Sequence, residues 1–418
     1  MGSARRRRGG QVTWLKLAVQ LGAFVVILGI PDGVLGVLWP SMRAAFHLPL
    51  DDLGVLTVAS AALYFAGGLI ADRVRTRLGS GNAMVASCGV ALVGLAVWSG
   101  APSWLLLLGA VALLGGSRGV IDAVLNAEAA LDGGVRRLGL LHGSWAIGGT
   151  LGPLLVAAVL AWAHDWRVAV VVVAAGVLVL MALALVDRQR DRSAVPAPTC
   201  PVALASPADA RRAGEPEAGA RRSDSAPSGG ARSRLRLVLT IATFVAYTAA
   251  ESGPIAWGYT YLIYDRHTSR TVAAVAIASY WAALMAGRFG LAVVDDRMAG
   301  TTILEASCIL MIAGTGLFWL LPGSLSIAGL PIAGLGAAAV FPMLMALMPS
   351  RLGEAATGHA VGISIAAASL AGPAAVAVFG VLAAHLGVGA LGVCLFAVTP
   401  VLYVTNRMLT VATPGRAA

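Results

Sequence analysis

The chain has 418 residues, of which 58% are hydrophobic and 12% are charged, and its formal net charge is +10. A soluble domain is roughly a quarter charged, so this composition excludes an ordinary soluble fold, which could not bury so much apolar surface. The charged residues also gather in short segments between long apolar runs. This distribution is typical of a protein that crosses a lipid bilayer several times.

Twelve apolar runs are long enough to cross a hydrocarbon core of about 30 Å, which takes about 20 residues of α-helix. They are too long and too uniformly apolar for the alternating strands of a β-barrel. Their approximate bounds are residues 13–38, 53–71, 81–99, 104–130, 138–161, 167–186, 236–262, 271–293, 301–321, 325–347, 355–384 and 388–408. The sequence therefore predicts an all-α membrane protein with twelve transmembrane helices.

The basic residues predict the orientation of these helices. With the basic segment 1–12 in the cytoplasm, the inner segments hold Lys16 and 23 arginines, the outer loops hold four arginines, and two arginines lie within spans. This asymmetry follows the positive-inside rule. The first run is too long for a signal peptide and lacks a small-residue cleavage site, so it is expected to remain as a helix. We expect a bacterial inner-membrane protein with both termini cytoplasmic, whose positive charge reflects topology and not nucleic-acid binding.

Asp32 is the first ionisable residue inside a span, and each such residue is a functional candidate because charge in a bilayer costs about 3 kcal/mol or more. It follows Pro31, which loosens the helix, and loosened backbone that lines a cavity offers carbonyl groups to a ligand. Asp32 is therefore a candidate for proton coupling and for solute binding. The alternative is a kinked helix whose acid is satisfied by a neighbour.

Arg118, Asp122 and Asn126 are spaced i, i+4 and i+8 in the run 104–130 and form one polar stripe, which is expected to face a cavity. Asp122 is the strongest candidate for a proton site, with Arg118 one turn away modulating it. Asn126 is a candidate for solute binding. A static ion pair that merely neutralises Arg118 is the other interpretation.

His142 and Trp145 lie in the next run among glycines that permit a close helix contact. An imidazole there could relay protons, although a hydrogen bond across the helix contact would explain it equally well. Trp145 is a candidate for lining the cavity.

Glu251 and Trp257, with Pro254 between them, make the run 236–262 similar in composition to the first run. A tryptophan face stacks well against a sugar ring, and a carboxylate binds its hydroxyl groups, so both residues are candidates for solute binding. The alternative is a second kinked helix with an interfacial tryptophan.

The stretch 187–235 lacks periodicity and is rich in Ala, Pro, Ser, Gly and Arg, which predicts a disordered cytoplasmic linker. It separates a six-helix bundle at 13–186 from another at 236–408, with a tail at 409–418. Three short patterns recur in the same order at an offset of about 220 residues. They are an acid beside Gly and Pro, a span that ends with a glycine followed a few residues later by Asp-Arg, and a Gly-Pro pair. These repeats predict two six-helix pseudo-repeats of the kind found in transporters.

The segment Gly68–Leu78, GLIADRVRTRL, resembles the loop 2-3 signature of the major facilitator superfamily, with Arg75 in place of its second glycine. The resemblance implies that Gly68, Asp72, Arg73 and Arg77 form a gate, in which Asp72 latches onto the facing half. Arg288 and Asp296 are the expected counterparts in the second half.

A narrower resemblance is to the fucose:proton symporter branch and bacterial sugar porters. It rests on Leu38-Trp39-Pro40, Asp122 to Asn126, Leu141 to Gly148, and Trp281 to Phe289. It implies proton coupling at Asp122. The branch also places an acid at the position of Gly36, where Asp32, one turn earlier, is the available substitute.

These observations predict a secondary active transporter that works by alternating access, with proton-coupled uptake of a sugar or polyol as the leading function. A proton-driven exporter of drugs or metabolites and a non-transporting sensor or scaffold are the alternatives. The sequence contains no catalytic motif, which argues against an enzyme, and the four isolated cysteines give no metal spacing. We expect no cofactor and no metal, and a monomer whose partners are a small solute, protons and lipid.

Overall fold

The computed structural model describes residues 14–132, 134–193, 230–291 and 299–413. In this part of the chain, twelve helical spans are long and apolar enough to cross a membrane, so the prediction of an all-α membrane fold with twelve spans is confirmed. The first span is formed by α1 (Trp14–Ala23), the π-helix η1 (Phe24–Gly29) and α2 (Ile30–Phe46). The other helices of the first half are α3 (Asp52–Leu78), α4 (Ser80–Gly100), α5 (Trp104–Asp132), α6 (Gly134–Ala163) and α7 (Trp166–Ser193).

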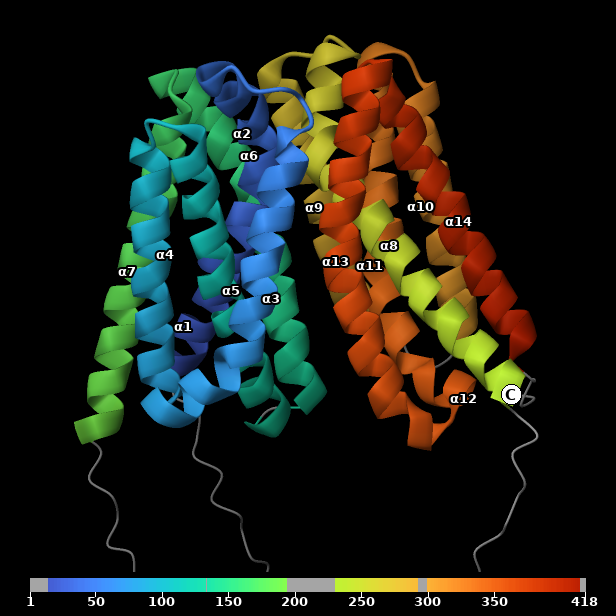
Figure 1. The fold of residues 1–418 in the computed structure, drawn as a ribbon, viewed down its shortest axis with the longest axis horizontal. Coiled ribbons are helices and arrows are strands. Elements are labelled where there is room, and N and C mark those ends of the chain that lie inside the picture. The colour runs from blue at the N-terminus through green and yellow to red at the C-terminus, as the bar shows by residue number, and fades with distance from the viewer. Residues whose placement is uncertain (1–13, 133, 194–229, 292–298, 414–418) are drawn as a thin grey trace, which may run out of the picture.

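The second half begins with α8 (Gly230–Tyr264) and α9 (Arg270–Leu291). It continues with α10 (Gly300–Leu320), the 3-10 helix η2 (Gly323–Ala328), α11 (Gly329–Ala346), the short α12 (Met348–Leu352), α13 (Glu354–Leu386) and α14 (Ala390–Ala412). The two halves form two bundles that stand side by side (Figure 1). We call them the N-bundle (α1 to α7) and the C-bundle (α8 to α14).

Several helices extend beyond the predicted spans. The first span continues through Pro40 to Phe46, α7 continues to Ser193, and α8 begins at Gly230, so both α7 and α8 reach into the predicted linker at 187–235. Hydropathy detects only the part of a helix that lies in lipid, and these ends carry polar residues. Residues 1–12, 194–229, 414–418 and Asp296 lie outside the described residues.

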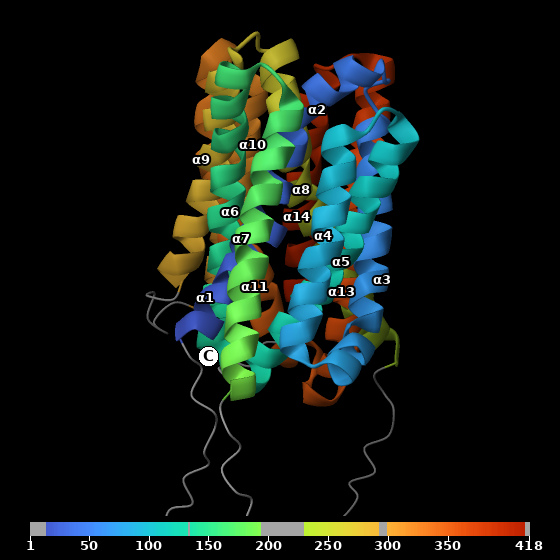
Figure 2. The same cartoon turned by 90° about the vertical axis from the view of Figure 1, so that its left-hand side faces the viewer.

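The two bundles touch most closely toward one end. A Cβ atom on Gly36 would lie 2.5 Å from the carbonyl oxygen of Ile255, and one on Gly54 would lie 2.4 Å from the Cα atom of Ala377. Both contacts join the N-bundle to the C-bundle, the first between α2 and α8 and the second between α3 and α13. Toward the lower end of Figure 1 the bundles spread apart. Figure 2 shows α6 and α9 side by side, and these helices also join the two bundles.

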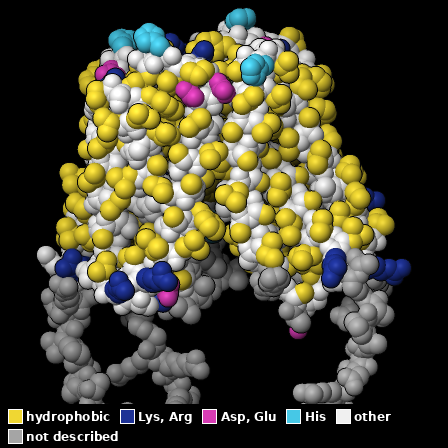
Figure 3. Space-filling view, in the orientation of Figure 1, with side chains coloured by type: hydrophobic (Ala, Val, Ile, Leu, Met, Phe, Trp, Pro, Cys, Tyr) yellow, Lys and Arg dark blue, Asp and Glu magenta, His cyan; other side chains and the backbone are white. Residues whose placement is uncertain are grey.

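Charge divides between the two ends as the sequence predicted. On the face that Figure 3 shows, most arginine and lysine side chains lie at the lower end, the histidine side chains lie at the upper end, and the wall between the two ends is largely apolar. We call these the arginine-rich end and the histidine end. Large side chains such as Val93, Leu178 and Val238 are more than half exposed on this wall, as expected for helices whose solvent is lipid.

Candidate functional site

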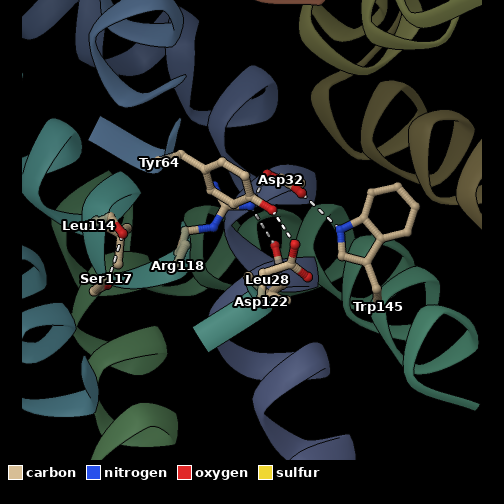
Figure 4. Close-up of polar contacts among 8 residues, drawn as sticks. All are labelled: Leu28, Asp32, Tyr64, Leu114, Ser117, Arg118, Asp122 and Trp145. Atoms are coloured by element: carbon tan, nitrogen blue, oxygen red, sulfur yellow. Dashed lines mark hydrogen bonds and ion pairs between the residues drawn. The ribbon is translucent and has the colours of Figure 1, made fainter. Parts of the chain in front are cut away.

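A partly buried ion pair joins the first span to α5 within the N-bundle (Figure 4). The guanidinium of Arg118 donates to the carboxylate of Asp32 and, at 3.0 Å, to the backbone carbonyl of Leu28. The two side chains are 14% and 29% exposed. The sequence spacing favoured a pairing of Arg118 with Asp122 on its own helix, but the arginine reaches across to the neighbouring helix instead.

The π-helix η1 carries the backbone carbonyl of Leu28 that Arg118 contacts. A π-helix has a wider turn than an α-helix, and Pro31 has no N–H to donate to a preceding carbonyl group. Arg118 donates to the carbonyl of Leu28. The loosening that Pro31 predicted is therefore a local change of helix type just before Asp32.

Asp122 accepts hydrogen bonds from the hydroxyl of Tyr64 at 2.6 Å and from the amide of Asn126 at 2.9 Å. Among the described residues it has no arginine within ion-pair distance. Tyr64 can reach it because α3 and α5 approach closely: a Cβ atom on Gly119 would lie 1.9 Å from the carbonyl oxygen of Tyr64. Asp122 is thus a carboxylate held in the bundle by neutral donors.

Trp145 on α6 connects this cluster to the C-bundle. Its indole N–H donates to Asp32 at 2.9 Å, and its ring meets that of Trp281 on α9 edge-on, with centroids 4.8 Å apart. The guanidinium of Arg288, also on α9, lies over the Trp145 ring at 5.0 Å. The missing side chain of Gly149 makes room for Trp281, because a Cβ atom there would lie 2.4 Å from the indole.

The C-bundle contributes a second acid and its partners. Glu251 on α8 accepts a hydrogen bond from the hydroxyl of Tyr247 at 2.7 Å and forms a looser pair with Arg288 at 3.5 Å. The side chains of Glu251 and Arg288 are 14% and 15% exposed. Polar and aromatic contacts therefore run without interruption from Arg118 through Trp145 to Glu251, across the boundary between the bundles.

His142 lies one helical turn from Trp145 and is exposed. It is within electrostatic reach of Asp122 on α5 and of Arg288 on α9. One edge of its ring packs against Phe24 of the π-helix, with centroids 5.7 Å apart. We call the set Asp32, Arg118, Asp122, Asn126, His142, Trp145, Glu251 and Arg288 the central network.

Trp257 lies apart from the central network. It is fully buried, its indole N–H donates to the carbonyl of Val376 at 2.9 Å, and its ring fills the place of a side chain at Gly380. It joins α8 to α13 within the C-bundle, and we do not include it in the candidate site.

The residues expected to form a gate lie in two places. Asp72 is 77% exposed at the arginine-rich end and pairs at 2.7 Å with Arg75 on its own helix. Gly68 has open space around its Cα atom, and Arg73 and Arg77 are exposed near Asp72. Arg288, in contrast, belongs to the central network.

Tyr64 and Tyr247, which donate hydrogen bonds to Asp122 and Glu251 of the central network, are not among the candidates that the sequence indicated. Tyr247 stands four residues before Glu251, so the i, i+4 rule could have found it. No pattern along the chain indicates Tyr64, because its partner lies on another helix. The described residues contain no group of three potential metal ligands.

Comparison with known proteins gave one family and several related folds. A family model for the Major Facilitator Superfamily matches residues 21–376. A bacterial homologue of the human lysosomal transporter Spinster, solved inward-facing and unoccupied, is 16% identical with a TM-score of 0.65 over 96% of this chain and 98% of that chain. FucP in the outward conformation is 16% identical with a TM-score of 0.58 over 94% and 98% of the two chains. A structure described with proton-dependent oligopeptide transporters is 13% identical with a TM-score of 0.69 over 96% and 98%. No curated protein sequence matched the chain.

Proposed function

We propose that this chain, which belongs to the Major Facilitator Superfamily, is a proton-coupled secondary transporter that takes up a small hydroxylated solute of the sugar or polyol type. It alternates between a form open at the arginine-rich end and a form open at the histidine end. By the positive-inside rule, the arginine-rich end faces the cytoplasm, and both termini then lie on the cytoplasmic side of the bacterial inner membrane.

The central network is the observation that carries this proposal. It places three carboxylates and two arginines in the middle of bundles whose other faces are apolar. Each such charge costs about 3 kcal/mol or more in a bilayer, so it is retained where it contacts water, a solute or a partner that changes during function. Because the network crosses the boundary between the bundles, movement of one bundle against the other alters it.

Asp122 is the proposed proton site. Asp32 and Glu251 each have an arginine that neutralises them, whereas the described partners of Asp122 are the neutral donors Tyr64 and Asn126. A proton on Asp122 would remove the unbalanced charge of the network. His142, exposed and close to Asp122, is the proposed relay between that carboxylate and the aqueous space.

The solute is proposed to bind against Asn126, Trp145 and Glu251, which come from both bundles. Binding to both bundles at once favours the occluded form, since a ligand shifts a conformational equilibrium by its differential affinity for the two states. The bundles lie farther apart at the arginine-rich end than at the other end (Figure 1), which supports release of the solute toward the cytoplasm.

Purified protein in proteoliposomes tests the proposal. Sugars, polyols and common drugs are first screened by thermal shift, and those that bind are tested for flux under an imposed pH gradient. Uptake driven by an inward proton gradient, with alkalinisation outside, is expected. Efflux driven by that gradient would identify an exporter instead, and absence of any flux would identify a non-transporting membrane protein.

A further inference from the structure

We propose that the solute carries a carboxylate and that Arg288 is the residue that binds it, so that the substrate class is a small hydroxylated carboxylic acid. This inference rests on the proposed function and narrows it. It comes from a comparison of the two arginines of the central network, which differ in how fully their donors are used.

Arg118 donates hydrogen bonds to two protein groups. It binds Asp32 and the carbonyl of Leu28, two groups that lie close together on the first span, although its Nε atom has no partner among the described residues. A solute that displaced either group would take the Arg118 donor from the Leu28 carbonyl or from the Asp32 carboxylate, which would keep only the indole N–H of Trp145 among its described donors. Such losses are costly, so Arg118 is poorly suited to bind a ligand.

Arg288 uses fewer of its N–H donors in described hydrogen bonds than Arg118 does. A guanidinium has five N–H donors, and the described hydrogen bonds of Arg288 use one of them, in a contact of 3.5 Å to Glu251. Its Nε atom is buried and has no hydrogen-bond partner among the described residues. Unsatisfied buried donors are rare in native proteins, and each calls for a partner that is absent or a role in function.

The rest of the Arg288 environment holds the guanidinium ready for a planar anion. The side chain lies over the Trp145 ring, which limits its rotation. Arginine recognises carboxylates through paired N–H donors in a fixed plane. A carboxylate at this position would use the donors that the described protein groups leave free.

Glu251 keeps a hydrogen-bond donor when Arg288 binds a ligand. It keeps the hydroxyl of Tyr247 at 2.7 Å when Arg288 turns toward a ligand. The guanidinium also has enough donors to contact Glu251 and a ligand carboxylate together. Binding therefore does not leave the Glu251 carboxylate without a donor.

A second unpartnered atom indicates the hydroxylated part of the solute. The amide oxygen of Asn126 is buried and accepts no hydrogen bond from the described residues, while its amide nitrogen donates to Asp122. The site thus offers a free donor at Arg288 and a free acceptor at Asn126. A molecule with a carboxylate to accept and a hydroxyl group to donate satisfies both.

Binding to the purified full-length protein tests the inference with three matched pairs of probes: glucuronate and glucose, gluconate and sorbitol, and glycerate and glycerol. Dissociation constants are measured by quenching of tryptophan fluorescence and by isothermal titration. In at least one pair the acid should bind about tenfold or more tightly than its neutral partner, because hydrogen bonds to charged groups are the stronger ones. Neutral partners that bind as well as the acids in every pair, or acids that all fail to bind, would overturn the inference.

Variants assign the preference to Arg288. Arg288→Gln should abolish the preference for the acid, whereas Arg288→Lys should keep part of that preference because the charge remains but the planar fork is lost. Arg407→Gln, which removes an arginine that is 48% exposed at a distant ion pair with Glu305, is the matched control and should retain the full preference. An acid preference that survives Arg288→Gln in folded protein would remove Arg288 from the role.

The transport assay separates the two proposals. Proton-driven uptake of a neutral sugar or polyol, without preference for its acid, would contradict the carboxylate and leave the transporter function intact. Absence of proton-driven flux for every solute that binds would contradict the transporter function itself, whatever the acid preference.

Discussion

The two bundles hold their buried charges in different ways. In the N-bundle, Arg118 binds both Asp32 and the Leu28 carbonyl, while Asp122 is held separately by Tyr64 and Asn126. In the C-bundle, Arg288 and Glu251 form one loose pair at 3.5 Å. Within the described part of this central region, the N-bundle therefore has a close ion pair and a carboxylate without an arginine partner, and the C-bundle has an arginine that uses fewer of its donors than Arg118 does.

This difference separates two tasks that a coupled transporter has to perform. A carboxylate without a countercharge responds to protons, and an arginine with free donors responds to anions. The related sequence patterns at Asp32 and Glu251 predicted similar sites in the two halves. Packing made them different, because the π-helix gives Arg118 a second partner for which Arg288 has no described counterpart.

The largest effect is expected from Asp122→Asn, which removes the carboxylate that we assign to the proton. Concentrative uptake should fall to the equilibrium level, while exchange of solute across the membrane continues because the solute contacts remain. Uptake driven by a pH gradient and exchange of labelled solute, measured in the same proteoliposomes, check this. Full accumulation by the variant would remove Asp122 from the coupling role.

Arg118→Gln and Arg288→Gln test whether the two arginines contribute unequally to the stability of the protein. Loss of one partner from a buried ion pair costs about 3 kcal/mol or more, and Arg118→Gln also leaves the Leu28 carbonyl without its donor. Arg288→Gln should cost about 1 kcal/mol, since its pair with Glu251 is looser, at 3.5 Å, and Glu251 keeps Tyr247. Thermal unfolding in detergent, followed by intrinsic fluorescence, should give a clearly lower transition for Arg118→Gln. Equal transitions would show that the two pairs are equivalent after all.

Tyr64→Phe and Tyr247→Phe compare the hydroxyl groups that serve the two acids. Asp122 would keep Asn126 as its described donor, whereas Glu251 would keep Arg288. A hydrogen bond to a charged group contributes about 1.5 to 3 kcal/mol. We expect about a tenfold loss in the rate of proton-driven uptake for Tyr64→Phe and about a twofold loss for Tyr247→Phe. The reverse order would contradict the assignment of Asp122 as the proton site.

The smallest effect on stability is expected from Asp72→Ala, at the arginine-rich end. Asp72 is 77% exposed and its described ion pair is with Arg75 on its own helix, and such surface pairs contribute about 0.5 kcal/mol or less. The unfolding temperature should stay within about 1 °C of the parent protein. If Asp72 latches the bundles together when this end closes, the variant should nevertheless transport more slowly. An unchanged rate would limit Asp72 to its contact with Arg75.

Contacts within one helix could be predicted from the sequence, because the helical period determines which residues share a face. The twelve spans follow from hydropathy and the contact of Asp122 with Asn126 from this rule, and the Tyr247 contact with Glu251 was within its reach. The high cost of charge in lipid also marks Asp32, Arg118 and Asp122 as candidates on the basis of the sequence alone.

Contacts between helices were decided by the tertiary structure alone. The partner of Arg118, the contact of Tyr64 with Asp122 and the place of Arg288 all depend on how the helices are rotated and how closely they approach. Glycines at 119 and 149 set that approach, since a single added Cβ atom at either position would collide with its neighbour. Hydropathy and spacing describe each helix separately, so they contain no information on which faces meet. That is the physical reason why the candidate residues could be named from the sequence while their partners could not.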